Sequence, residues 1–206
     1  MSANTATAGD TVQFYDLDEH AHPEGHSTML GFWIYLMSDC LIFAILFACF
    51  AVLGGNYAAG PAPKDLFDLP LVALNTAMLL FSSITYGFAV LQMQQGKVKG
   101  VQLWLAITGL FGLAFLGIEL FEFHHLIEIG AGPQRSGFLS AYFTLVGTHG
   151  VHVTGGLIAF LLIIGRTFTT RHYSHAQATG AVVTSYYWHF VDVVWIALFL
   201  MIYVLK

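Results

Sequence analysis

The chain has 206 residues, of which 57% are hydrophobic and only 9% are charged, and its formal net charge is −5. Soluble domains carry about 25% charged residues, and a soluble protein of this composition would expose large apolar patches that promote aggregation. The negative charge also argues against nucleic-acid binding, which usually needs a basic patch. We therefore expect an integral membrane protein with no nucleic-acid partner.

Residues 1–29 are predicted to form a polar N-terminal tail. This stretch contains no Lys or Arg, but it carries five acidic residues together with His20, His22 and His26. A signal peptide would instead begin with a basic region followed by a short apolar run. The composition is typical of a disordered tail, and a weak metal site at the three histidines is the alternative.

Residues 30–206 are predicted to form a transmembrane domain, because five apolar runs each reach the roughly 20 residues that cross a bilayer as a helix. Strands of a β-barrel are excluded, since they would need alternating segments of about 10 residues. The connections are short, so consecutive helices are expected to be antiparallel neighbours. The sequence thus predicts an all-α bundle of five transmembrane helices, at about 30–53, 69–93, 101–123, 138–165 and 181–205.

Glycine and aromatic residues follow two further patterns along these spans. Glycines gather in the third and fourth spans, among them Gly112 and Gly156, and predict a seam where helix backbones approach closely. Aromatic residues toward the span ends, including Trp188, are typical of the belt at a membrane–water interface.

The loops carry a small excess of basic residues on one side of the predicted bundle. Four lie on the side of the N-terminal tail and three on the other, which by the positive-inside rule favours a cytoplasmic N-terminus and a C-terminus across the membrane. The two sets are Lys97, Lys99, Arg166 and Arg171 against Lys64, Arg135 and Lys206.

Ionisable residues in or next to the spans are the candidates for function, because a charge at mid-membrane costs about 2.5–3.5 kcal/mol on insertion scales. Asp39 lies near the middle of the first span. It is either a proton-linked or lipid-linked group that faces protein, or a neutral acid that is hydrogen-bonded to a neighbouring helix. The candidate residues are Asp39, Glu119, Glu122, His125, His149, His152, His189 and Asp192.

Three pairs of these candidates are spaced one helical turn apart, which puts two ligands on one face of a helix. Such pairs could build a buried di-metal site, and this is the hypothesis of a stand-alone enzyme. A di-iron bundle would need a second Glu-x-x-His motif, which the sequence lacks. We therefore favour interhelical hydrogen bonds and lipid contacts, and we expect no catalytic residue and no metal ligand. The pairs are Glu122 with His125, His149 with His152, and His189 with Asp192.

Several motifs resemble subunit III of the haem–copper oxidases. They are the run WHFVDVVW at 188–195, GTHGVHV at 147–153, and the GFWI and SDCLIF segments at 31–34 and 38–43. The resemblance covers nearly everything after residue 29. Many family members have seven spans, whereas five spans are typical of the quinol oxidases and of some bacterial cytochrome c oxidases. The segments at 81–87, 122–127 and 132–140 are similar to the cytochrome bo-type ubiquinol oxidases of proteobacteria.

This resemblance implies an accessory, non-redox subunit of a proton-pumping terminal ubiquinol oxidase in the bacterial cytoplasmic (inner) membrane, with the C-terminus on the periplasmic side. The expected partners are subunits I, II and IV and membrane phospholipids. The haems and copper would lie in subunit I, so this chain should hold no redox cofactor, only phospholipid in a cleft between two helix groups. Asp39, where many relatives carry Glu, would face the region of proton entry, and the other candidates would hold helices and lipid together.

Three other interpretations are kept beside this one. The chain could be subunit III of a five-span bacterial cytochrome c oxidase, or the stand-alone di-metal enzyme described above. A proton-coupled transporter is the weakest of the three, because five spans do not divide into equal inverted repeats and no span is broken by proline at its middle.

Overall fold

A computed structural model of the chain describes residues 25–58, 60, 66–169 and 175–204. The predicted N-terminal tail lies almost wholly outside the described residues. The same is true of Lys64, Arg171 and Lys206, on which the predicted orientation partly rests.

Five long helices account for nearly all of the described residues. Each contains a stretch that is long and apolar enough to cross a membrane, and the described residues form no strand. The predicted all-α fold with five spans is therefore confirmed, with most helices running a few residues past the predicted apolar runs. The helices are α1 (Gly25–Leu53), α3 (Leu69–Gln94), α4 (Val98–Glu128), α5 (Gly137–Thr169) and α6 (His175–Phe199), and α6 continues into the π-helical turn η1 (Leu200–Val204).

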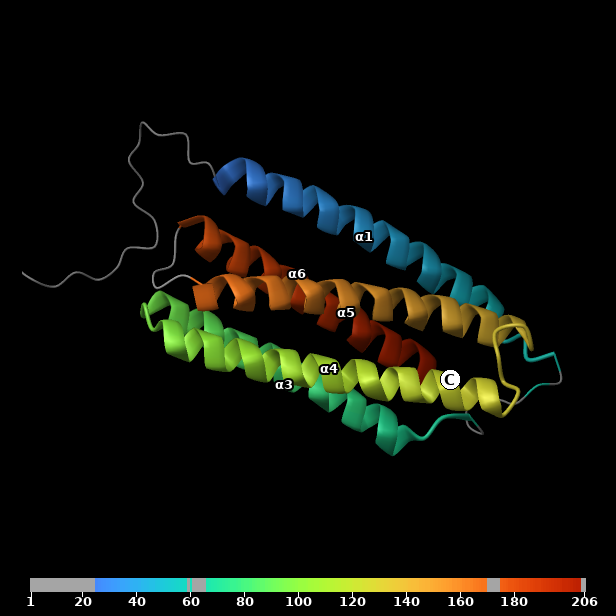
Figure 1. Cartoon of the computed structure of the whole chain (residues 1–206). Coiled ribbons are helices and arrows are strands. Elements are labelled where there is room, and N and C mark those ends of the chain that lie inside the picture. The colour runs from blue at the N-terminus through green and yellow to red at the C-terminus, as the bar shows by residue number, and fades with distance from the viewer. Residues whose placement is uncertain (1–24, 59, 61–65, 170–174, 205–206) are drawn as a thin grey trace, which may run out of the picture.

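The helices are arranged with α5 and α6 in the middle, α1 along one edge, and α3 with α4 along the opposite edge (Figure 1). Extensive packing joins α3 to α4, α4 to α5 and α5 to α6, as expected for consecutive antiparallel helices, whereas α1 packs on α5 and α6. The prediction that all consecutive helices are neighbours is therefore wrong for α1 and α3. The segment 54–68 that joins them is longer than the segments 95–97, 129–136 and 170–174 between the other helices, and this length allows α1 to pack on the far side of the central helices.

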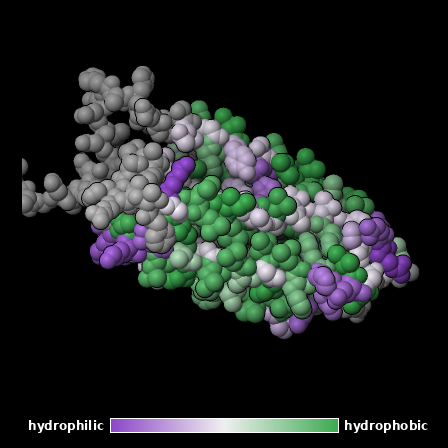
Figure 2. All heavy atoms as spheres, in the orientation of Figure 1, coloured by the Kyte–Doolittle hydropathy of each residue, from purple (hydrophilic) through white to green (hydrophobic). Residues whose placement is uncertain are grey.

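The side of the bundle seen in Figure 2 is apolar over its middle, with polar residues gathered toward its two ends. Large hydrophobic side chains point outward, with exposed fractions of 63% for Ile34, 67% for Leu41 and 71% for Val151. In a bilayer this surface faces hydrocarbon, and the helices satisfy their own backbone hydrogen bonds there.

Two helices end at glycines in the left-handed conformation. Gly96 follows α3 with φ of 67° and Gly130 follows α4 with φ of 77°. At each end the residue after the glycine donates its N–H to a carbonyl five residues earlier, Lys97 to Gln92 and Ala131 to Leu126. These bonds form Schellman caps, which favour glycine because other residues rarely adopt a positive φ.

The close helix contacts at Gly112 and Gly156 are made by a tryptophan and not by facing backbones. Trp188 of α6 is fully buried, and a Cβ added at Gly112 of α4 or at Gly156 of α5 would come within 2.8 Å or 2.9 Å of its indole ring. Its Nε1 donates a hydrogen bond of 2.8 Å to Ser82 Oγ of α3. The two glycines therefore make room for a ring, and Trp188 joins four helices instead of lying in an interfacial belt.

Other hydroxyl and indole groups connect α3 to its neighbours. Trp195 Nε1 donates to Thr76 Oγ1 at 3.0 Å, and the Tyr86 hydroxyl donates to a backbone carbonyl of α6 at 2.6 Å. Thr85 and Thr108 share a hydrogen bond of 2.8 Å between α3 and α4. Interhelical hydrogen bonds of this kind add to van der Waals packing, which is the main attraction between helices in lipid.

Candidate functional site

Asp39 of α1 and His152 of α5 form a polar contact near the middle of their helices. Asp39 Oδ2 lies 3.5 Å from His152 Nε2, and both side chains are largely buried. His152 Nδ1 lies 2.8 Å from the carbonyl oxygen of Thr148. A carbonyl oxygen can only accept, so Nδ1 carries a hydrogen. In neutral His152 the Nε2 lone pair then faces Asp39, whose Oδ2 has no hydrogen-bond partner among the described residues.

Aromatic groups surround this pair. The Phe43 ring centroid lies 5.0 Å from that of His152, and the Tyr187 hydroxyl donates to the His152 carbonyl at 2.9 Å. Tyr35, one turn before Asp39 on α1, stacks on Tyr187 with ring centroids 6.2 Å apart. Tyr35 and Tyr187 were not predicted for this site; the spacing of Tyr35 from Asp39 marks Tyr35, but no sequence pattern links Tyr187 to the pair.

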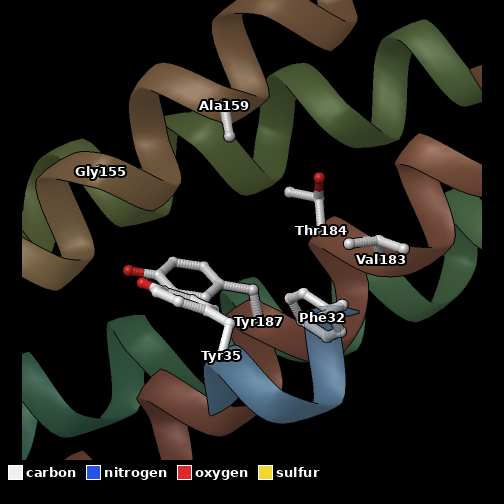
Figure 3. A pocket seen from close by; sticks show the side chains of 7 residues that line it. All are labelled: Phe32, Tyr35, Gly155, Ala159, Val183, Thr184 and Tyr187. Carbon is white, nitrogen blue, oxygen red and sulfur yellow. The ribbon is translucent and has the colours of Figure 1, made fainter. Parts of the chain in front are cut away.

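An open pocket of about 290 Å³ lies between α1, α5 and α6 beside the two tyrosines. Figure 3 shows the Tyr35 and Tyr187 rings side by side with their hydroxyls on the same side of the pocket. The lining is mostly apolar, so the pocket suits a chain or ring more than a charged ligand. It is lined by Phe32, Tyr35, Gly155, Ala159, Val183, Thr184 and Tyr187.

His149 lies one turn before His152 but in different surroundings. It is fully buried, and neither ring nitrogen has a hydrogen-bond partner among the described residues. Its ring contacts Trp195, with centroids 5.2 Å apart, and Phe115, with centroids 5.9 Å apart. The two histidines of the pair therefore differ in their polar contacts.

Glu119 and Glu122 of α4 both point into the bundle and are buried. Asn75 Nδ2 of α3 donates to Glu119 Oε2 at 3.0 Å. Tyr142 of α5 and Tyr203 of η1 lie close to both carboxyls, and their hydroxyls are 3.3 Å apart. Asn75 was not among the predicted site residues, because those residues were chosen for the cost of burying a charge and the Asn75 amide is neutral.

His189 and Asp192 form a third polar group on α6. Asp192 is buried, His189 is about half exposed, and His189 Nδ1 lies 3.9 Å from Asp192 Oδ2. Ser83 Oγ of α3 lies 3.2 Å from the same ring nitrogen. This predicted pair is therefore brought together at the surface between α3 and α6.

The remaining pair, Glu122 with His125, lies at the edge of the buried face of α4. Glu122 is buried while His125 is exposed, so the two side chains are in different surroundings although they are one helical turn apart. No group of three or more His, Cys, Asp or Glu side chains suited to a metal ion occurs in the described part of the chain. The geometry thus gives the di-metal hypothesis no support.

The fold and the polar groups define a class of protein: a multi-pass membrane protein whose buried polar side chains join helices to one another. Residues 15–206 match the family model described as cytochrome c oxidase subunit III. The chain belongs to this subunit III family of the haem–copper oxidases, and as an oxidase subunit it is part of a complex of several chains.

Individual relatives agree with this assignment. The chain is 53% identical to cytochrome bo(3) ubiquinol oxidase subunit 3 of Pseudomonas putida over 89% of this chain and 88% of the relative. It is 48% identical to the subunit of the same name from Pseudomonas aeruginosa, over 91% and 89%. It is also 39% identical to cytochrome c oxidase subunit 3 of Bacillus sp. (strain PS3), over 91% and 90%.

Proposed function

We propose that this chain is the accessory, non-redox subunit III of a proton-pumping terminal ubiquinol oxidase. The observation that carries the proposal is the 53% identity, over nearly the whole length of both chains, to a protein named as subunit 3 of a ubiquinol oxidase. Subunit III would stabilise the complex and support proton uptake, while the haems and copper, and with them the oxygen chemistry, belong to subunit I. This chain would hold no redox cofactor.

The proposed partners are subunits I, II and IV and membrane phospholipid. The open pocket between α1, α5 and α6 supports lipid binding, because its apolar lining can take an acyl chain while the hydroxyls of Tyr35 and Tyr187 offer hydrogen bonds. We place the protein in the bacterial cytoplasmic membrane with a cytoplasmic N-terminus and a periplasmic C-terminus. Labelling of single cysteines introduced into the loops between helices tests this orientation.

We assign the proton-linked role to Asp39. It is buried, its Oδ2 lies 3.5 Å from the imidazole of His152, and it contacts a central helix from α1. Glu119, Glu122, His149, His152, His189 and Asp192 would hold helices and lipid in place, and His125 would interact with lipid headgroups at the exposed end of α4.

The test is Asp39→Ala in the purified complex, with Ser38→Ala as the matched control. Ser38 is the preceding residue of α1, and its hydroxyl bonds only within its own helix, to the Tyr35 carbonyl. We expect Asp39→Ala to shorten the number of turnovers before inactivation and to lower the protons pumped per electron, with Ser38→Ala unchanged. If both variants match the parent in both quantities, the proposed role of Asp39 is wrong.

The main alternative is subunit III of a five-span cytochrome c oxidase, which the similarity to the Bacillus subunit favours. The chains that co-purify with this one decide between the two. A subunit II without a copper-A centre, in a complex that oxidises ubiquinol and not cytochrome c, supports the quinol oxidase. Metal analysis of the isolated chain tests the di-metal enzyme, which requires stoichiometric iron, zinc or copper.

A further inference from the structure

The buried polar side chains of Glu119 and Asn75 each contain an oxygen atom that lacks a hydrogen-bond partner among the described residues. Glu119 Oε1 and Asn75 Oδ1 are both buried, and neither has a hydrogen-bond partner among the described residues. Both side chains are almost completely inaccessible, with exposed fractions of 2% and 1%. An unpaired acceptor in such a place is costly, and in hydrocarbon no solvent is available to satisfy it.

The two unpaired oxygens belong to side chains that already bond each other. Asn75 Nδ2 donates to the other carboxyl oxygen of Glu119, Oε2, at 3.0 Å. A side-chain amide has one donor group and one acceptor, and a protonated carboxyl likewise has one donor and retains an acceptor. One hydrogen on Glu119 Oε1 would therefore complete a two-point pair, in which the carboxyl donates to Asn75 Oδ1 and accepts from Asn75 Nδ2.

The surrounding groups favour a neutral Glu119. Glu122 lies one turn away on the same helix and interacts electrostatically with Glu119, and like-charged carboxyls disfavour double ionisation. The neighbours from the other helices are phenols, Tyr142 of α5 and Tyr203 of η1. The described Lys and Arg side chains form no ion pair with either carboxyl within 4 Å. A charge on Glu119 would have no counter-ion among the described residues, and burying such a charge is far more costly than binding a proton.

We propose that Glu119 and Asn75 form a proton-binding site in which a hydrogen on Glu119 Oε1 is held by Asn75 Oδ1. This site is distinct from the Asp39–His152 pair and does not depend on the role proposed above. Glu122 is slightly more exposed and interacts with both Tyr142 and the exposed Asp68 at the start of α3. Glu122 therefore lies between the site and the nearer membrane face.

The test is infrared spectroscopy of the full-length chain, purified from membranes with its co-purifying subunits. We expect the parent-minus-Glu119→Gln difference to show the loss of a carbonyl band of a protonated carboxyl. Glu122→Gln, the same change one turn away, is the matched control and should retain that band. Asn75→Ala should shift the band to higher frequency, because the carboxyl loses its amide partner.

Thermal stability provides an independent readout. The glutamine in Glu119→Gln can donate to Asn75 Oδ1 and accept from Nδ2, so it mimics the protonated acid and should change the Tm by less than about 2 °C. Glu119→Ala leaves the amide unpaired and should lower the Tm by about 4 °C or more.

Two infrared results would overturn the proposal. One is a difference spectrum in which Glu119→Gln removes only carboxylate bands. The other is a shift of those carboxylate bands when Ca²⁺ or Na⁺ is added, since a cation would then occupy the site in place of a proton. If Glu119→Gln does not assemble, Asn75→Ala decides the question, because an unshifted spectrum contradicts the pairing.

Discussion

Adding one methyl group at Gly112 should destabilise the bundle, whereas the same change one turn away at Gly109 should not. A Cβ at Gly112 would lie 2.8 Å from the Trp188 ring and 3.0 Å from Leu157, but a Cβ at Gly109 would have no neighbour within 4 Å. Trp188 cannot move aside easily, because it is fully buried and its Nε1 is hydrogen-bonded to Ser82 on a third helix.

The magnitude follows from two opposing effects. Overpacking a well-filled core costs about 1–3 kcal/mol, while replacing glycine by alanine within a helix gains up to about 1 kcal/mol. Gly109→Ala has only the gain, and Gly112→Ala has both effects. The gain cancels in the comparison, so the free energy of unfolding of Gly112→Ala should be lower than that of Gly109→Ala by about 1–3 kcal/mol.

Reversible unfolding of the purified chain in mixed detergent micelles measures this difference. Gly156→Ala and Gly150→Ala on α5 repeat the comparison, because a Cβ at Gly156 would lie 2.9 Å from the same ring and one at Gly150 would meet nothing within 4 Å. In a Trp188→Phe background the Gly112→Ala cost should shrink, since the smaller ring leaves room. Gly112→Ala and Gly109→Ala variants of equal stability, within the roughly 0.5 kcal/mol expected for uncoupled sites, would refute the reasoning.

Further predictions concern the hydrogen bonds between helices, and the same unfolding assay measures each of them. Thr76→Val leaves the buried Trp195 indole N–H without its acceptor and should lower the free energy of unfolding by about 1–3 kcal/mol. Thr76→Ser keeps the hydroxyl and should lower it clearly less. Equal losses in the two variants would mean that the bond contributes nothing. Tyr86→Phe removes a donor to α6 and should cost about 0.5–1.5 kcal/mol, so an unchanged stability contradicts a stabilising bond. A double-mutant cycle with Thr85→Ala and Thr108→Ala should give a coupling of about 0.6 kcal/mol, and strictly additive effects would show that the two hydroxyls do not interact.

The position of α1 and the partners of the buried polar groups could not be read from the sequence. A rule based on short connections predicted that α1 would lie beside α3, but the segment 54–68 is long enough for α1 to reach α5 and α6 instead. The cost of a buried charge pointed to Asp39 and Glu119, but it could not point to Asn75, which is polar without being ionisable. Spacing alone paired Glu122 with His125, of which only Glu122 is buried.

The number of spans, the all-α class and the family could be predicted from the amino-acid sequence, because hydrocarbon requires about 20 apolar residues per crossing and the motifs at 147–153 and 188–195 are long and specific. The sequence also indicated which ionisable residues enter the membrane. Which polar side chains meet became visible only in the folded bundle: Asp39 with His152, and Glu119 with Asn75. The apolar pattern sets how each helix sits in lipid. Side-chain shape, such as the Trp188 ring between two glycines, and complementary hydrogen-bonding groups determine which helices become neighbours.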